Sequence, residues 1–342
     1  MKKLLFVTQV MDQHDSVLGA YHEWVTELAS YMDSITVICL YEGTHSLPEN
    51  VSVFSLGKEQ GRVPAYRYAA RFLLLAWRLK NRYDSVFVHM NQEYILIAGP
   101  LWKLLGKRIY MWRNHYAGSW LTDIAASFCI KVFCTSRHSY TAKYRNTQFM
   151  PVGVEITEEK PDVVRAPRSI LFLARIAPSK RLDLFIEALG LLQRQGVAFT
   201  ASVYGSPLPE HQSYHDGLIQ QTKEMGLEGR IVFHPGISHK ETPAVFAAHE
   251  IFVNCSPSGM FDKTLFEAAA ADCLVLATSD DFARETDERL RFTTVGELAD
   301  RLTCLLHEGP ETLLELRQVL KKATEAHSRT ALMAALSNAL SG

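Results

Sequence analysis

Two stretches of the chain carry side chains that could hold a phosphate-bearing ligand. In the first, a turn-rich segment follows the apolar run Ile251–Val253, and Asp262 can cap the free amides of the helix that comes next. A helix N-terminus attracts anions, because its unpaired N–H groups and the helix dipole both point at the ligand. Glu267 lies one turn inside that helix, within reach of a group bound near its end. Taken alone, Glu267 is an ordinary surface carboxylate.

The second stretch places two cations after another apolar run. Arg175 and Lys180 follow Ile170–Leu173 and stand five residues apart. A guanidinium can grip two phosphate oxygens, and an ammonium acts as a movable point charge. Such groups stabilise negative charge most where it develops during a reaction, so they can be catalytic as well as binding groups. The alternative interpretation is a surface pair beside an exposed helix.

Together the two stretches resemble family 4 of the retaining GT-B glycosyltransferases. The segment SPSGMFDKTLFEAAA at 256–270 is similar to the nucleotide-sugar site of that family, in which seven residues separate two glutamates. The second glutamate maps onto Glu267 and the first onto Gly259. The segment LFLARIAPSKRLDLFIEAL, which starts at Leu171, is similar to the family's strand, loop and helix with an arginine and a lysine. These two map onto Arg175 and Lys180.

The resemblance implies where the donor binds. An ionised carboxylate only accepts hydrogen bonds, so Glu267 suits the two hydroxyls of a ribose. Gly259 lies where the family has a glutamate near the donor sugar, and we expect Asp262 and Lys263 to take over part of that contact. The groups expected on the donor's diphosphate and ribose are Arg175, Lys180, Lys263, Thr264, Leu265 and Glu267.

Three further residues are assigned through the resemblance. His115 follows the apolar run 108–112 and corresponds to a histidine close to the donor sugar, so we predict that it is catalytic with Arg175 and Lys180. Ile237 lies where the family's backbone meets the nucleobase. Gly19 is the one residue of the loop 9–19 that fits the family's glycine-rich, acceptor-side loop.

The elements that must position these residues alternate between strand and helix. Apolar runs predict strands at 4–7, 35–40, 51–54, 85–89, 108–112, 132–135, 170–173, 200–204, 231–233, 251–253 and 274–277. Helical patterns lie at 20–31, 64–82, 94–105, 139–144, 183–195, 212–225, 241–248 and 261–271. Such alternation predicts an α/β fold with parallel sheets, whose ligands bind at the carboxyl ends of the strands.

With the resemblance, this pattern predicts a GT-B fold, in which two Rossmann-like βαβ domains face each other across a cleft. We expect an acceptor-side domain over 1–152, a charged linker over 153–168 and a nucleotide-sugar-binding domain over 169–312. A helical tail over 313–342 is expected to pack back towards the N-terminal domain. No GxGxxG motif follows the first strand, which argues against a dinucleotide dehydrogenase.

Composition narrows the class of protein. An apolar content of 47% and a charged content of 21% are those of a globular protein with sizeable cores. A net charge of −1 argues against a dedicated nucleic-acid binder. Six cysteines without CxxC spacing indicate thiols of a reducing compartment, so we expect a cytoplasmic protein. Cys129, Cys134 and His138 lack a fourth ligand nearby, and we expect no metal site.

The resemblance therefore implies a retaining, metal-independent glycosyltransferase that moves a sugar from a nucleoside-diphosphate donor to a glycan, lipid or other acceptor. UDP- or GDP-sugar is the expected donor, no cofactor is expected, and the expected pathway is surface polysaccharide or glycoconjugate synthesis. No Asp-x-Asp triplet is present to hold Mg²⁺ or Mn²⁺. Two alternatives stay open: a GT-B enzyme that hydrolyses or epimerises a nucleotide sugar, and a sugar-nucleotide-binding protein without turnover, which the glycine at 259 would permit.

A basic stretch at 62–82 is not explained by the donor site. It carries six positive residues and no acid, and Arg67, Arg71, Arg78 and Arg82 share one helical face. A solvated basic face is the default interpretation. The alternative is peripheral contact with an anionic membrane at its inner face, or with a lipid-diphosphate acceptor. No apolar window is long enough for a membrane span.

Overall fold

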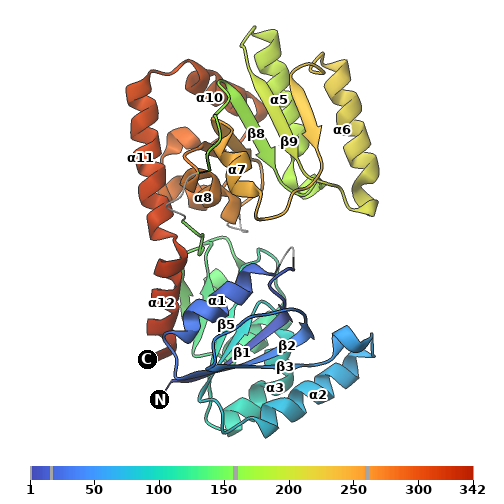
Figure 1. The fold of residues 1–342 in the computed structure, drawn as a ribbon, viewed down its shortest axis with the longest axis vertical. Coiled ribbons are helices and arrows are strands. Elements are labelled where there is room, and N and C mark those ends of the chain that lie inside the picture. Colours follow the sequence, from blue (N-terminus) through green and yellow to red (C-terminus); the bar gives the residue numbers. More distant parts are fainter. Residues whose placement is uncertain (1, 16–17, 157–160, 259–261, 342) are drawn as a thin grey trace. The chain divides into compact units, whose positions relative to one another are not determined.

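The computed structural model describes residues 2–15, 18–156, 161–258 and 262–341. The chain forms two compact units (Figure 1). Unit 1 contains Met1–Pro151 together with Arg329–Gly342, and unit 2 contains Val152–Ser328. None of the helices within the described ranges is long and apolar enough to cross a membrane.

Unit 1 is built on a parallel sheet of seven strands in the order β3-β2-β1-β4-β5-β6-β7. The strands are β1 (Lys3–Met11), β2 (Ser34–Glu42), β3 (Val51–Ser55), β4 (Ser85–His89), β5 (Arg108–Trp112), β6 (Lys131–Cys134) and β7 (Thr147–Phe149). The first six confirm the strands predicted from apolar runs. The seventh was missed, because it is a three-residue edge strand, Thr-Gln-Phe, with no buried side chain.

Helices cover both faces of this sheet, which explains why its strands are almost continuously apolar. On one face, Leu5 and Val7 pack with α2 (Ala65–Arg78), α3 (Glu93–Leu104) and α4 (Trp120–Ser127). On the other, Leu4 and Phe6 pack with α1 (Ala20–Ala29) and α12 (Arg329–Ser341). The alternation of side chains along β1 thus supplies two separate cores.

Unit 2 has a parallel sheet of five strands in the order β10-β9-β8-β11-β12. They are β8 (Ser169–Leu173), β9 (Thr200–Tyr204), β10 (Ile231–His234), β11 (Ile251–Asn254) and β12 (Leu274–Ala277), as predicted to within a residue. Its helices are α5 (Leu182–Arg194), α6 (Gln212–Glu224), α7 (Thr242–Ala247), α8 (Lys263–Ala270), α9 (Asp280–Glu285), α10 (Val295–His307) and α11 (Pro310–Ala326). One continuous hydrophobic core joins them to the sheet.

Two helical predictions need correction. Residues 139–144 form only a short 3₁₀ turn, Tyr140–Lys143, since the segment is too short to close several α-helical hydrogen bonds. The tail predicted as one helical stretch is two helices, α11 and α12, that break at His327 and Ser328. There the carbonyl of His327 accepts hydrogen bonds from the amides of Gly153 (2.9 Å) and Val154 (3.0 Å).

Candidate active site

The carboxyl ends of β8 and β11 lie side by side in the unit 2 sheet, because the two strands pair in parallel from Ile170 and Ile251 onward. The loop after β8 carries Arg175 and ends in the 3₁₀ turn Pro178–Lys180. The loop after β11 leads into α8. Residues about eighty positions apart therefore meet at the edge of the sheet where parallel α/β folds bind ligands.

Asp262 is the centre of a polar cluster at that edge. Its Oδ2 lies 2.7 Å from the ammonium of Lys180. The same oxygen accepts hydrogen bonds from the hydroxyl of Ser256 (3.1 Å) and the amide of Asn254 (3.3 Å). Asp262 occupies the N-cap position of α8, but its side chain makes no capping hydrogen bond. The predicted cap is therefore wrong, because the carboxylate is held by these three donors.

Lys180 keeps one N–H group that no described residue accepts. Its ammonium donates one hydrogen bond to Asp262 and another, at 3.0 Å, to the hydroxyl of Ser256. An ammonium has three N–H groups, so a third remains for a ligand. The side chains of Lys180 and Asp262 are only 19% and 27% exposed. The pair is thus positioned by its surroundings and is unlike a mobile surface ion pair.

Glu267 lies half-buried on α8, and among the described residues no side chain or amide hydrogen-bonds to its carboxylate. Burial raises the pKa of Glu267 above its usual range, whereas the charges of His239 and Lys263 lower that pKa and the charge of Asp262 raises it. A buried carboxylate without donors is costly. Hydroxyl groups of a ligand would supply the missing donors.

The remaining residues predicted on α8 are used in different ways. The ammonium of Lys263 lies 3.4 Å from the carbonyl of Gly153, and the hydroxyl of Thr264 accepts from the amide of Asn254 at 3.3 Å. Leu265 is buried in the core, and its own amide donates to the carbonyl of Asp262 at 3.3 Å. Thr264 thus joins the cluster, whereas Leu265 chiefly anchors the helix.

Two other predicted donor residues, Arg175 and Ile237, do not join the cluster. Arg175 is exposed and has no hydrogen-bond or ion-pair partner within the part of the chain that the structure describes. Ile237 lies half-buried in the loop between β10 and α7. Gly259 falls outside the described residues. The guanidinium of Arg175 is therefore available to a ligand anion.

His115 lies in unit 1, beyond the carboxyl end of β5, in the wall of a cavity of about 220 Å³. Its Nδ1 lies 3.0 Å from the amide nitrogen and 3.3 Å from the carbonyl oxygen of Ala117. The ring stacks on Tyr116, with centroids 4.6 Å apart. Arg113, Glu93 and Gln92 also line the cavity, and the buried Oε1 of Gln92 has no hydrogen-bond partner among the described residues.

Gly19 begins α1 in unit 1, where a side chain would not fit. A Cβ atom there would lie 2.5 Å from the carbonyl oxygen of Asp15. The amide of Gly19 donates to that same carbonyl at 3.0 Å. Close packing of the loop after β1 thus accounts for this glycine.

Sequence reasoning missed Asn254, Ser256 and His239 in unit 2 and Gln92 in unit 1. Asn254 and Ser256 come directly after the apolar run of β11, and Gln92 follows β4 by three residues. Polar residues just past buried strands were the signal that could have found them. His239 lies in a loop of varied composition, and nothing in its sequence surroundings marks it.

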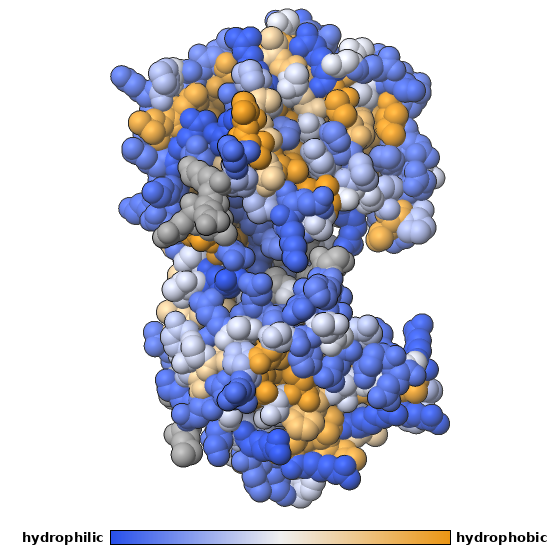
Figure 2. All heavy atoms as spheres, in the orientation of Figure 1, coloured by the Kyte–Doolittle hydropathy of each residue, from blue (hydrophilic) through white to orange (hydrophobic). Residues whose placement is uncertain are grey.

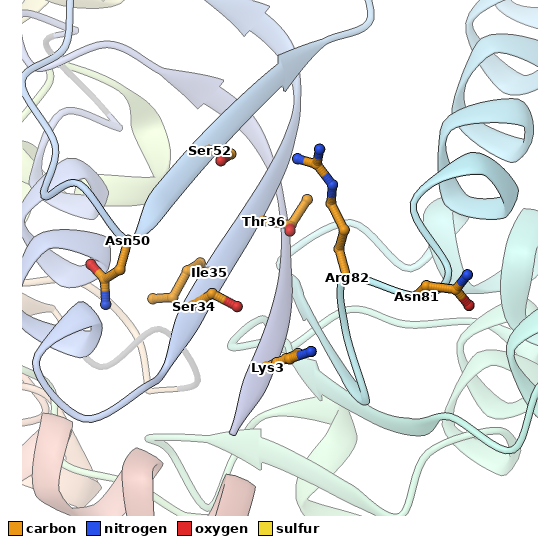
Figure 3. A pocket seen from close by; sticks show the side chains of 8 residues that line it. All are labelled: Lys3, Ser34, Ile35, Thr36, Asn50, Ser52, Asn81 and Arg82. Carbon is orange, nitrogen blue, oxygen red and sulfur yellow. The ribbon is translucent and has the colours of Figure 1, made fainter. Parts of the chain in front are cut away.

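A second polar pocket lies away from these groups. It has a volume of about 190 Å³ and is lined by Lys3, Ser34, Ser52 and Arg82, among others (Figure 3). Lys3 and Ser34 are the first residues of their strands. The pocket thus sits at the amino ends of the strands, opposite the edge where such sheets bind ligands.

The sequence profile of the family "Glycosyl transferases group 1" matches residues 155–326, half of the chain and nearly all of unit 2. The chain belongs to this family. The match includes Arg175, Lys180, Asp262 and Glu267.

The curated relatives match part of this chain, whereas the solved structures match nearly all of it. D-inositol 3-phosphate glycosyltransferase of Nocardia farcinica is 27% identical over 150 residues, which cover 40% of this chain and 33% of the relative. The chain thus matches about a third of that relative's length. The structure of Anabaena HepE in complex with UDP and glucose superposes over all of both chains, with a TM-score of 0.74 and 19% identity.

A third likeness agrees with these. The sucrose-phosphate synthase of Thermosynechococcus elongatus has a TM-score of 0.72 and 13% identity, with 99% of this chain and 98% of that one covered. At such identities the solved structures establish the fold. The two parallel-sheet units are those of a GT-B glycosyltransferase, which confirms the predicted fold class.

Proposed function

We propose that this chain is a retaining, metal-independent glycosyltransferase of family 4 that takes a sugar from a UDP- or GDP-sugar. The acceptor is a glycan, a lipid or another hydroxyl compound in surface polysaccharide or glycoconjugate synthesis. The observation that carries this proposal is the cluster of Lys180 and Asp262 beside the start of α8, together with Glu267, whose carboxylate has no donor among the described residues. At one sheet edge, the cations suit the diphosphate of a nucleoside diphosphate and the carboxylate suits its ribose.

The reaction shows why these groups are needed. The bond from the sugar's anomeric carbon to the diphosphate breaks, and a bond to the acceptor oxygen forms. The bonding electrons leave on the diphosphate, and the proton of the acceptor hydroxyl passes to an oxygen of that leaving diphosphate, so charge balances overall. Negative charge therefore grows beside Lys180 and Arg175, which stabilise it without a metal ion. Glu267 accepts the ribose hydroxyls, while Asp262 and Lys263 contact the sugar.

We assign the acceptor to the cavity in unit 1. Gln92, Glu93 and Arg113 line it with polar groups, and the imidazole of His115 can form a hydrogen bond with a hydroxyl group. The assignment of His115 as a catalytic group rests on the same placement. Support for the nucleotide comes from Anabaena HepE, whose solved structures hold UDP with glucose and UDP-glucose.

A ligand panel tests the donor assignment. Binding to the native state raises the melting temperature by mass action, so UDP, GDP, ADP and CMP should separate in a thermal-shift assay. We expect UDP or GDP to give the largest shift, and donor consumption to continue in excess EDTA. NMR of the product should show the donor's anomeric configuration.

Other results of these experiments would indicate a different function or mechanism. Free sugar formed without an added acceptor indicates a hydrolase, and tight binding without consumption indicates a binding protein. Inhibition by the chelator contradicts the metal-independent mechanism. An inverted anomeric configuration contradicts retention.

A further inference from the structure

The helix layer formed by α2, α3 and α4 has an outer face that is unusually apolar. The three helices pack on one face of the unit 1 sheet, α2 against α3 and α3 against α4, through the core that contains Phe72, Trp102 and Ala125. Their opposite sides therefore point away from the sheet together. Figure 1 labels α2 and α3 of this layer. Figure 2 shows hydrophobic side chains exposed among hydrophilic ones on the visible surface.

The exposed residues of α2 form a stripe. Tyr66, Leu73 and Trp77 are spaced by seven and four residues, so they lie on one side of the helix, with Leu74 beside them. All four are exposed. The buried side is formed by Phe72 and Ala76. The solvent side of the helix thus carries this apolar stripe beside exposed arginines, whereas an ordinary surface helix keeps its apolar residues on the core side.

The neighbouring helices also carry exposed apolar residues. Leu104, at the end of α3, is 84% exposed, and Trp120, at the start of α4, is 67% exposed. Leu121 and Ile124 are exposed on the same helix, one and four residues after Trp120. Extended apolar surfaces of this kind mark a place where a partner or a membrane binds.

Positive charge accompanies the apolar stripe. From Arg62 to Ser127, the segment that contains α2, α3 and α4, the chain has ten lysines and arginines and three acids, Asp84, Glu93 and Asp123. Arg67 and Arg78 are exposed on α2, and the ammonium of Lys80 lies 3.4 Å from the ring centre of Trp77. Arg71 differs, because its guanidinium donates to the carbonyl of Leu56 at 2.8 Å and holds the loop before α2.

We propose that the outer face of α2, α3 and α4 docks on the surface of an anionic lipid bilayer. Tryptophan and tyrosine favour the boundary between headgroups and acyl chains, and lysine and arginine attract anionic lipids. A second copy of the chain fits less well, since a symmetric contact would bring two sets of like charges together. The proposal concerns binding alone and is independent of the proposed reaction.

Vesicle flotation tests this surface with two matched pairs of variants. Leu74→Gln/Trp77→Gln removes apolar surface, and Arg67→Gln/Arg78→Gln removes charge. Their controls lie on unit 2, where Leu314→Gln alters an exposed leucine and Arg194→Gln/Lys223→Gln removes two exposed charges. Thermal melts confirm that each variant is folded. The vesicles contain phosphatidylcholine alone or mixed with phosphatidylglycerol.

We expect the wild type to float with the phosphatidylglycerol vesicles at low salt and to stay behind with phosphatidylcholine alone. Each α2 double variant should weaken binding about tenfold or more, and both controls should bind like the wild type. Brominated lipid should quench tryptophan fluorescence in the wild type and less in Trp77→Phe. The proposal is overturned if the wild type does not float, if Leu74→Gln/Trp77→Gln binds normally, or if that variant instead dissociates a dimer.

Discussion

At the scale of single residues, the two cations of the site differ in burial and in pairing. Lys180 is mostly buried and already paired with Asp262, whereas Arg175 is exposed and has no partner among the described residues. Both follow β8, so both can reach an anion at the carboxyl end of the sheet. Lys180 should therefore act as a fixed charge, and Arg175 should order when the donor binds.

Replacing either cation should impair transfer. Arg175→Ala and Lys180→Ala should each lower kcat/KM by roughly 10²-fold or more, the typical loss for a group that stabilises developing charge. Arg194→Ala, which removes an exposed arginine from α5, is the matched control and should keep normal turnover. Steady-state kinetics with the donor identified by the ligand panel provides the measurement. Near-normal activity in both variants would contradict the diphosphate assignment.

At Glu267, the protonated form favours folding, whereas the charged form favours ligand binding. Its pKa is raised by burial, so folding favours the protonated form. The carboxyl group thus supports the fold below its unfolded pKa of about 4.3, and this support is lost as the pH rises through the raised folded pKa. Glu267→Gln should therefore melt at a higher temperature than the wild type at pH 8, and the difference should disappear near pH 4.

The same variant should bind the nucleoside diphosphate less tightly, by about tenfold, because a charged acceptor makes stronger hydrogen bonds than an amide. Thermal melts at both pH values and calorimetry with the nucleotide measure the two effects. Equal melting temperatures and equal affinity would show that Glu267 is a surface carboxylate.

At the scale of elements, the start of α8 shows what sequence reasoning can and cannot reach. The strands were predictable, because buried parallel strands are continuous apolar runs, and Ile251–Asn254 is fully buried. Asp262 preceding a helix has the local signature of an N-cap. Its actual partner, Lys180, stands 82 positions earlier, and only the pairing of β8 with β11 brings the two together.

Asp262→Asn separates the two roles of that side chain. Asparagine caps a helix about as well as aspartate. Asp262 binds Lys180 instead of capping, but the hydroxyl of Ser256 also accepts from that ammonium at 3.0 Å, so Lys180 should still reach the diphosphate in the variant, whereas the charged contact with the sugar is lost. We expect kcat/KM for the donor to fall at least tenfold while affinity for the free nucleoside diphosphate is retained. Donor kinetics and nucleotide binding measured side by side check this, and unchanged donor kinetics would exclude a contact with the sugar.

At the scale of the whole molecule, His327 connects the two segments in which the chain passes from one unit to the other, one after Pro151 and one after Ser328. Its Nδ1 accepts the amide of Val152 at 3.1 Å, and its ring stacks on Phe266. Burial lowers the pKa of His327 from 6.5 to about 4. Folding therefore favours the neutral ring, and stability present above pH 6.5 should be lost as the pH falls towards 4.

The predicted loss is about 3 kcal/mol, the equivalent of that change in pKa. Unfolding in denaturant at pH 7 and pH 4.5 measures most of it. His327→Gln should show a smaller pH dependence than the wild type, whereas His307→Gln, at an exposed position, should behave like the wild type. Identical pH dependence in all three proteins would show that the ring of His327 is not buried in its neutral form.

The placement of α12 in unit 1 has a consequence for synthesis on the ribosome. Leu332, Met333 and Leu336 complete the core that Leu4 and Phe6 begin, although all of unit 2 is translated between them. Unit 2 is one continuous segment and can close its core as soon as it emerges. The nascent first unit must instead wait with part of one face of its sheet uncovered, since α1 covers only the remainder of that face. Ribosome-bound chains that end before α12 should therefore recruit chaperones through the N-terminal segment.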